Sequence, residues 1–582
     1  MSKMRRRFRV PRSKPGKILM NLLVTLVLGG LYFYVTLPAL NLHSGDFYSF
    51  IGFLCVVYVV CAVITSGFRT DPTVVVAPAE RLKGYVRFIK QQCLPVGLLF
   101  VALIIVALVG EVLSMPIFRA GSYRDLLQVE DGNFTEDITQ ISFDKIPTLD
   151  RDSAEYLGDR QMGTLSDMVS QFEYPEGEST QINYQGRPVR VSPIAYADLI
   201  KWFTNRSEGL PAYVLVDMVT QEASVVRLQE GIKYSFSEPL NRNIIRHLRF
   251  QYPTYMFSTP RFEIDEEGQP WWIAPRLVKT IGLFGGTDIE GAVLCNAITG
   301  ESTYYDIADV PSWVDNVYTP QLIMEQYDYH GTYINGFFNS ILGQRGVTLT
   351  TDGYNYIALN DDVYVYTGVT SANADQSNLG FLLSNQRTKE TKFYEAPGAT
   401  EYAAMGSAQG VVQDLKYTAT FPLLLNIAGE PTYFIPLMDA TQLVKSYAMV
   451  NVAQYQVVAT GSTVSQCNQE YIRLLSEKDI TETEELPQTE ASGVIAEIRS
   501  AVLEGNTYYF VRMEGEEVFY SLSAASNELA VILNVGDRVT IEHEATDEEK
   551  PILDGYSIVD YEKAAAAAAP SEDVSGEEPP AA

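Results

Sequence analysis

The chain contains little histidine and little cysteine, with 4 His and 5 Cys among 582 residues. A metal site or a dense disulfide framework is therefore not expected. The sequence also lacks a G-x-x-x-x-G-K-[S/T] phosphate loop, a G-x-S-x-G nucleophile turn and an H-E-x-x-H pair. We predict no catalytic residue, no cofactor and no metal ion, and we expect a protein that is not an enzyme.

Positive charge is scarce as well, because 43 Lys and Arg face 72 Asp and Glu, which gives a net charge of -29. Sequence-independent binding to nucleic acid depends on clustered Lys and Arg, so no nucleic acid partner is expected. Apolar residues are plentiful at 46%, which excludes a wholly disordered chain. The length allows about four domains of ordinary size.

The charges are unevenly distributed. Residues 1–118 hold 13 Lys and Arg against 4 Asp and Glu, whereas residues 119–582 hold 30 against 68. The first part also contains three apolar runs of 22 to 25 residues, which are 18–40, 47–68 and 94–118. A bilayer-crossing helix needs roughly 20 such residues. One run could be a buried helix of a soluble protein, but three in succession predict three transmembrane helices.

The loops between these runs predict their orientation. Residues 1–17 carry eight basic side chains and no acid, the loop 69–93 carries five Lys and Arg, and the turn 41–46 carries none. By the positive-inside rule, the amino terminus and the loop 69–93 are cytoplasmic. We expect a multi-pass protein of the cell membrane whose large C-terminal region is extracytoplasmic.

A short pattern, L-x-[D/N]-x-x-T-x-E, occurs three times, although chance predicts roughly 0.02 copies in a chain of this length and ordinary composition. Apolar alternation flanks each copy and predicts a strand, a tight turn and a second strand, with the Asp or Asn accepting backbone hydrogen bonds. The turn residues are Asp217, Thr220 and Glu222, then Asn296, Thr299, Gly300 and Glu301, and then Asn385, Thr388 and Glu390.

A second element, Gly-x-Pro before an apolar strand, begins at Gly186, Gly268 and Gly429, with a weaker copy at Gly353. These glycines are 82, 85 and 76 residues apart, so the repeat is about 80 residues long. Segments with helical spacing lie between the strand pairs, at 243–250, 320–341 and 401–415. Each unit is predicted to be a helix followed by three or four antiparallel strands.

The D-x-x-T-G-E turn after an apolar strand resembles PepSY-type domains, which are α+β modules of bacterial envelope proteins and peptidase propeptides. The resemblance implies non-catalytic modules associated with protease inhibition, folding assistance or envelope assembly. The chain as a whole is similar to multi-span membrane proteins of Gram-positive bacteria, and that similarity implies no activity.

Five short strand candidates within 491–563 resemble an OB-like barrel. That segment holds 15 acidic and 5 basic side chains, which favours a protein contact or a spacer over nucleic acid. The expected fold class is three N-terminal transmembrane helices, α+β tandem repeats and a small all-β barrel. The expected order is a basic cytoplasmic segment (1–17), a membrane domain (18–118), a connector (119–159), four repeats (160–479), an acidic linker (480–490), the barrel (491–563) and a disordered tail (564–582).

A few residues are candidates for contacts or chemistry. Glu111, in the third apolar run, is a candidate intramembrane polar site, with placement at the outer interface as the alternative. Trp271 and Trp272 are a candidate aromatic contact surface, with core packing as the alternative. Acidic pairs that could serve a hydrolase are Asp361 with Asp362 and Glu266 with Glu267; a disulfide between Cys295 and Cys467 is left open.

We expect a non-enzymatic binding or scaffolding protein of the bacterial cell envelope, in contact with the lipid bilayer and with a protein or peptide partner, because tandem repeats build long contact surfaces. Two alternatives stay open. One is a cell-wall glycan or peptide hydrolase that uses acidic residues, and the other is an accessory subunit of a transporter or signalling complex. No oligomeric state is predicted.

Overall fold

The computed structural model describes residues 14–65, 79–138, 146–165, 167–359, 362–372, 377–478, 480, 489–503, 506–524, 527–543 and 551–563. Most of the predicted basic segment, part of the loop 69–93, most of the acidic linker and nearly all of the predicted tail lie outside these residues. The chain divides into two compact units, 1–444 with 448–458, and 445–447 with 459–582.

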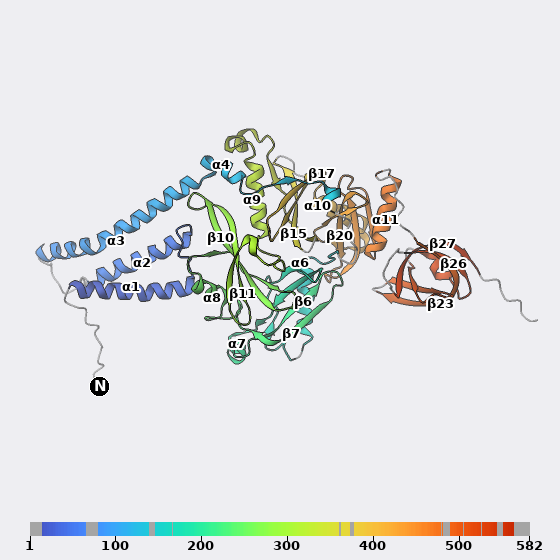
Figure 1. Cartoon of the computed structure of the whole chain (residues 1–582), viewed down its shortest axis with the longest axis horizontal. Coiled ribbons are helices and arrows are strands. Elements are labelled where there is room, and N and C mark those ends of the chain that lie inside the picture. Colours follow the sequence, from blue (N-terminus) through green and yellow to red (C-terminus); the bar gives the residue numbers. More distant parts are fainter. Residues whose placement is uncertain are drawn as a thin grey trace, which may run out of the picture. The chain divides into compact units, whose positions relative to one another are not determined.

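Three helices in the described residues are long and apolar enough to cross a membrane (Figure 1). They are α1 (Lys14–Thr36), α2 (Gly45–Thr65) and α3 (Ala79–Ser114). The three predicted apolar helices are thus confirmed, but the bounds of the third differ: it begins at Ala79, within the predicted loop 69–93, and it ends at Ser114 instead of continuing to residue 118. The reason is Pro116, which has no N–H to continue α3 and begins a separate helix, α4 (Pro116–Arg124).

Four sheets follow the membrane helices, and in each of them four main strands pair antiparallel in chain order. The first contains β3 (Thr180–Tyr184), β4 (Arg187–Pro193), β6 (Leu210–Asp217) and β7 (Ala223–Ile232). The second contains β9 (Arg261–Ile264), β10 (Pro270–Ile281), β11 (Gly285–Asn296) and β12 (Ser302–Asp306). The third contains β14 (Asn355–Leu359), β15 (Asp362–Ser371), β16 (Ser377–Asn385) and β17 (Thr391–Ala399). A two-residue strand, β1 (Glu130–Asp131), also joins β17 of the third sheet in parallel. The fourth contains β19 (Leu423–Ile427), β20 (Glu430–Met438), β21 (Val444–Asn451) and β22 (Val458–Gly461).

A helix precedes each sheet: α6 (Arg151–Gly163), α8 (Ile244–Gln251), α9 (Pro320–Thr332) and α10 (Glu401–Val411). Each begins after an N-cap side chain, namely Asp150, Asn243, Thr319 and Thr400, which accepts a hydrogen bond from the backbone N–H three residues later. A short strand also pairs with the second, third and fourth sheets: β8 (Met256–Phe257) with β10, β13 (Thr348–Thr350) with β15, and β18 (Thr418–Ala419) with β20. In the first segment the short strands β2 (Phe172–Glu173) and β5 (Ala195–Tyr196) form a separate two-stranded sheet. The predicted succession of helix and antiparallel strands is therefore present in each segment.

The three predicted turns share one geometry. The side chains of Asp217, Asn296 and Asn385 each accept hydrogen bonds from the backbone N–H groups two and three residues later, at 2.8 to 3.0 Å. The fifth residue of each turn has a positive φ, which is 61° at Gln221, 76° at Gly300 and 66° at Lys389. The three turns join strands, as predicted. In each turn the oxygen of the Asp or Asn side chain accepts from N–H groups that have no strand partner, and this stabilises the turn.

The hydrophobic core between the second and third sheets positions the polar site described below. It unites Ile273 and Leu294 of the second sheet with Val365 and Leu382 of the third. The linker 310–319 and the buried face of α9 fill the space between them, through residues that include Val314, Val317 and Ile323. The first turn of α9 is therefore held where the sheets meet.

The second unit contains α11 (Val464–Glu477) and five strands: β23 (Thr489–Leu503), β24 (Asn506–Met513), β25 (Phe519–Ser523), β26 (Arg538–His543) and β27 (Ile552–Glu562). Their hydrogen-bonded order is β23-β24-β25-β27-β26, and β26 returns to β23, so the ring closes. β25 and β27 run parallel, and the other neighbours run antiparallel. The likeness of this ring to an OB fold stays a prediction.

The shared turn geometry generates a stability prediction at Gly300. Its positive φ disfavours any residue with a Cβ by about 1–2 kcal/mol, and an added Cβ would also overlap the Tyr234 ring. We expect Gly300→Ala to lower the unfolding midpoint more than Gly429→Ala, because Gly429 has a φ of 82° but open space around it. Thermal unfolding followed by circular dichroism measures both; equal losses would contradict a role for the Tyr234 contact.

Candidate functional site

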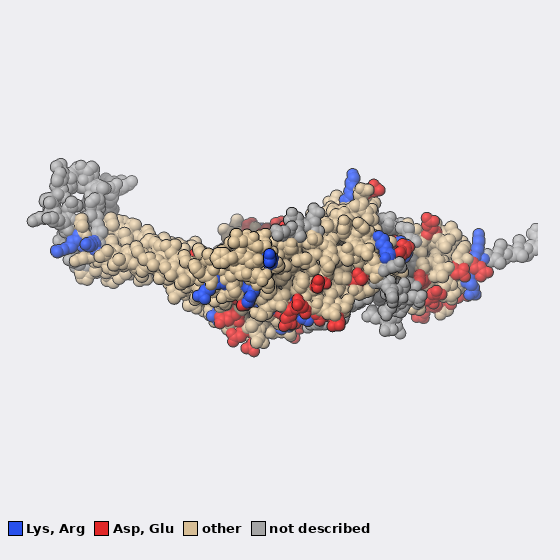
Figure 2. Space-filling model, turned by 90° about the horizontal axis from the view of Figure 1, so that it is seen from above, with Lys and Arg blue, Asp and Glu red and all other residues tan. Residues whose placement is uncertain are grey.

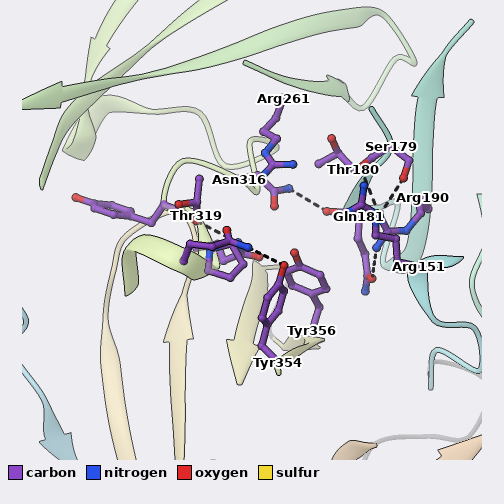
Figure 3. A pocket seen from close by; sticks show the side chains of 14 residues that line it. Arg151, Ser179, Thr180, Gln181, Arg190, Arg261, Asn316, Thr319, Tyr354 and Tyr356 are labelled. Atoms are coloured by element: carbon purple, nitrogen blue, oxygen red, sulfur yellow. Dashed lines mark hydrogen bonds between the residues drawn. The ribbon is translucent and has the colours of Figure 1, made fainter. Parts of the chain in front are cut away.

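A polar cavity lies where the first three sheets and the start of α9 meet (Figure 3). Its volume is about 60 Å³. One water needs about 10–15 Å³ on such a scale, so the cavity can hold several waters or one group of carboxylate or phosphate size. It is lined by Arg151, Ser179, Thr180, Gln181, Arg190, Arg261, Asn316, Tyr318, Thr319, Pro320, Gln321, Tyr354, Tyr356 and Gln386.

Arg190, on β4, forms the floor of this cavity and is 4% exposed. Its guanidinium donates to the Ser179 hydroxyl at 3.1 Å and to Gln181 Oε1 at 3.4 Å, but Nε has no hydrogen-bond partner among the described residues. Burial lowers the pKa of Arg190, yet a guanidinium stays protonated. A buried cation therefore lines the cavity.

Two further arginines border the same space. Arg261 enters from β9, and no described residue forms a hydrogen bond or ion pair with its guanidinium (Figure 3). Arg151, at the start of α6, forms an ion pair with Glu155 at 2.9 Å and is half exposed at the rim. None of the lining residues is Asp or Glu, although the chain has 72 of them. The cavity is therefore electropositive, and we call it the arginine cavity.

The start of α9 adds partial positive charge to this site. Thr319, Pro320 and Gln321 line the cavity, and the first N–H groups of a helix attract anions. Two phenols, Tyr354 and Tyr356, point into the space from the third sheet (Figure 3). Burial raises the pKa of Tyr356, so its hydroxyl keeps its proton and can donate. The arrangement suits an anionic oxygen group held by several donors.

The sequence analysis missed this site, although a signal was present. Aligned on the Gly-x-Pro element, Arg190 occupies the position of Trp272 in the second sheet and Tyr433 in the fourth. Both aromatic residues are fully buried. The weaker copy at Gly353 places Ile357 there, which is also buried. A charged residue at a position where the other three copies hold a buried apolar or aromatic side chain is the signal that was missed.

Two buried carboxylates lie beside the cavity without lining it. Glu263, fully buried, accepts the backbone N–H groups of Asp315 at 3.0 Å and Asn316 at 2.9 Å. Asp315 accepts the N–H of Asn183 at 2.6 Å. Burial raises the pKa of Glu263 to about 7, and burial together with the Glu263 charge raises the pKa of Asp315. Their hydrogen bonds to the backbone indicate a structural role.

The predicted turn residues do not enter the arginine cavity. Asn296 and Thr299 instead line one wall of an open hollow of about 640 Å³ beside β7, together with Gly268 and Tyr213. Their counterparts Asp217, Thr220, Glu222, Asn385, Thr388 and Glu390 remain hairpin residues.

The two tryptophans differ from the predicted contact surface. Trp272 is 0% exposed and its Nε1 donates to the Tyr234 carbonyl at 2.7 Å, so its assignment to a contact surface was wrong. Trp271 is partly buried and donates to Asp265 Oδ2 at 2.9 Å. Alternate residues of a strand face opposite sides, and here both sides are covered.

Glu111 lies near the end of α3 and is exposed. Its charge acts on Lys279 of the long β10–β11 hairpin, whose tip residue Leu283 contacts Gly110. Glu111 is therefore close to the sheets that follow the membrane helices, which favours the predicted alternative of an interfacial position over a site in mid-membrane.

The acidic pairs proposed from sequence are not brought together. Asp362 forms an ion pair with Arg387, and Glu266 and Glu267 lie in the turn before β10. Asp361 lies outside the described residues. Within the described part of the chain, no three His, Cys, Asp or Glu side chains cluster as metal ligands, and the cysteines form no disulfide.

No model of a known protein family matches the chain, and no curated protein does. The geometry of the cavity therefore carries the functional argument alone.

The pair Glu263 and Asp315 generates a pH prediction. A carboxyl group with a raised pKa in the folded state stabilises the fold below about pH 4, and this stability is lost as pH rises through about 7. We expect Asp315→Asn, which keeps an acceptor for Asn183, to reduce the stability loss between about pH 5 and 8, because it removes one of the two buried charges.

Chemical denaturation at several pH values measures this effect. Asp309→Asn is the matched control, because Asp309 is exposed and the substitution removes the same charge. A pH profile of Asp315→Asn parallel to that of the Asp309→Asn variant would contradict the assignment.

Proposed function

We propose that the chain is a membrane-anchored binding protein of the bacterial cell envelope, and that it holds an anionic group of a protein or peptide partner in the arginine cavity. The observation that carries this proposal is the convergence of Arg151, Arg190 and Arg261 on a cavity lined by no acid, in a chain of net charge -29. A carboxylate or phosphate in this cavity would lie beside the guanidinium of Arg190 and offset its buried charge.

An extracytoplasmic position for the sheets is part of the proposal. The support is the basic composition of residues 1–17 and of the loop 69–93, together with the three apolar helices. In Figure 2, the helical arm is uncharged along most of its length, and blue side chains gather at the end away from the sheets.

We also propose that the four helix-and-sheet segments are tandem PepSY-like units, and that the C-terminal ring is OB-like. Their common N-caps, strand order and turn geometry support the first statement. The five-stranded closed order with one parallel pair supports the second. The acidity of residues 491–563 favours a protein contact for the ring.

Anion-dependent stability tests the cavity. Thermal unfolding of the full chain in nanodiscs is measured with inorganic phosphate or acetate, against chloride at equal ionic strength. Because a ligand that binds the folded state raises the unfolding midpoint, we expect phosphate or acetate to stabilise the wild type. Arg261→Gln is expected to lose most of this increment.

The matched control is Arg160→Gln, an exposed arginine of α6 whose loss changes the net charge equally. It should respond to the anions as the wild type does. Equal responses of all three proteins would contradict an anion site at Arg261. Crosslinking in membranes then tests the partner: a protein captured by the wild type and by Arg160→Gln, but lost in Arg261→Gln, is the expected result.

A further inference from the structure

The surface directly beyond the third membrane helix is apolar and exposed. Met115, Ile117 and Phe118 are 41%, 44% and 64% exposed, and they follow immediately after the last residue of α3. Single exposed apolar residues are ordinary on soluble proteins, but a group of them marks a contact surface. This group continues the lipid-facing surface of α3 onto α4.

A second exposed apolar group lies at the end of α9. The segment 334–346 contains a π-helical turn, η3 (Asn339–Gly343). Phe338, Ile341 and Leu342 in this segment are 69%, 60% and 83% exposed. These values are among the highest for large apolar residues outside the membrane helices.

Aromatic contacts join the two groups. Tyr123 of α4 contacts Tyr329 and Tyr333 of the α9 region, with ring centroids 4.8 and 6.3 Å apart. His330 Nδ1 lies 3.1 Å from the Arg124 carbonyl oxygen, within hydrogen-bond distance. The end of α9 is thus attached to the helix that leaves the membrane, and Figure 1 shows α4 and the top of α9 side by side.

Hydrogen bonds fix the apolar segment in this exposed form. The side-chain amides of Asn335 and Asn339 both donate to the Arg345 carbonyl, at 2.9 and 3.0 Å. The Arg345 N–H donates back to Asn339 Oδ1 at 3.2 Å. These bonds close the loop and keep its apolar side chains, Phe338, Ile341 and Leu342, exposed to the surroundings.

The two segments that carry the exposed apolar residues, 115–124 and 334–346, contain basic residues and no Asp or Glu. These residues are Arg119, Arg124 and Arg345, and Arg124 pairs with Asp125, the next residue of the chain. The rest of the chain after residue 118 is strongly acidic. An apolar surface with basic residues and no acid is the composition that enters the headgroup layer of a membrane containing anionic lipids.

The geometry points to a second membrane contact, in which a lipid-contact surface formed by Ile117, Phe118, Phe338, Ile341 and Leu342 rests in the headgroup layer of the bilayer that α3 crosses. The basic residues Arg119 and Arg345 pair with lipid phosphates there. This inference rests on the proposed membrane anchoring. It holds the end of α9, whose other end borders the arginine cavity, at the membrane surface.

Fluorescence quenching by lipid tests the contact. In the full chain with its five cysteines replaced by alanine, Leu342→Cys is labelled with an environment-sensitive fluorophore and reconstituted in phosphatidylcholine–phosphatidylglycerol nanodiscs. The reference position is Val411→Cys on α10, which is 55% exposed and apolar. We expect lipid-borne nitroxide to quench the label at 342 several-fold more than the label at 411.

A charge reversal adds a second readout. Arg345→Glu should reduce quenching at position 342 in these nanodiscs and have a smaller effect in phosphatidylcholine alone. Equal quenching at 342 and 411, in nanodiscs that retain the protein, would overturn the contact. Protection of the 342 label from aqueous quenchers without quenching by lipid would also overturn it, because that result would indicate a protein neighbour. Failure of the chain to co-elute with nanodiscs would instead overturn the anchoring.

Discussion

The arrangement of the first three sheets depends on residues 315–318 of the linker 310–319. Their polar groups form hydrogen bonds with residues of all three sheets. Glu263 of the second sheet binds two of their N–H groups, and Asn183 of the first sheet donates to Asp315. Gln386, in the third turn, accepts two more N–H groups and donates to a carbonyl. Because buried backbone groups are costly to leave without partners, these bonds fix the linker and, with it, the start of α9.

The position of α9 in turn determines the electrostatics of the arginine cavity. The partly buried Arg387 has an acid partner in Asp362, with which it forms an ion pair. Arg190 donates to Ser179 and Gln181 but forms no direct ion pair, and the Glu155 carboxylate reaches it only through the Ser179 hydroxyl. A buried cation without a direct ion pair is unfavourable. The folded protein therefore maintains a site that an anionic group would stabilise, and this links the linker geometry to binding.

The four sheets share a backbone arrangement but differ in the side chains at one equivalent position. The turns at Asp217, Asn296 and Asn385 have the same hydrogen bonds, and the four sheets have the same strand order. The position equivalent to Arg190 nevertheless holds a buried Trp272 or Tyr433 in other sheets. A common scaffold therefore supports a hydrophobic core in some units and a polar cavity at the junction of the first three.

The sequence by itself determined the three apolar helices, the alternation of helix and strand and the turns, because each depends on residues near in sequence: apolar runs, N-cap residues and an Asp or Asn that binds its own turn. It did not determine the burial of Trp272 or the cavity. Arg151, Arg190 and Arg261 meet only after three sheets pack around the linker, and Phe118 and Leu342 share a surface only because Tyr123 contacts α9. Long-range packing decided these features, because the residues that meet are distant in sequence.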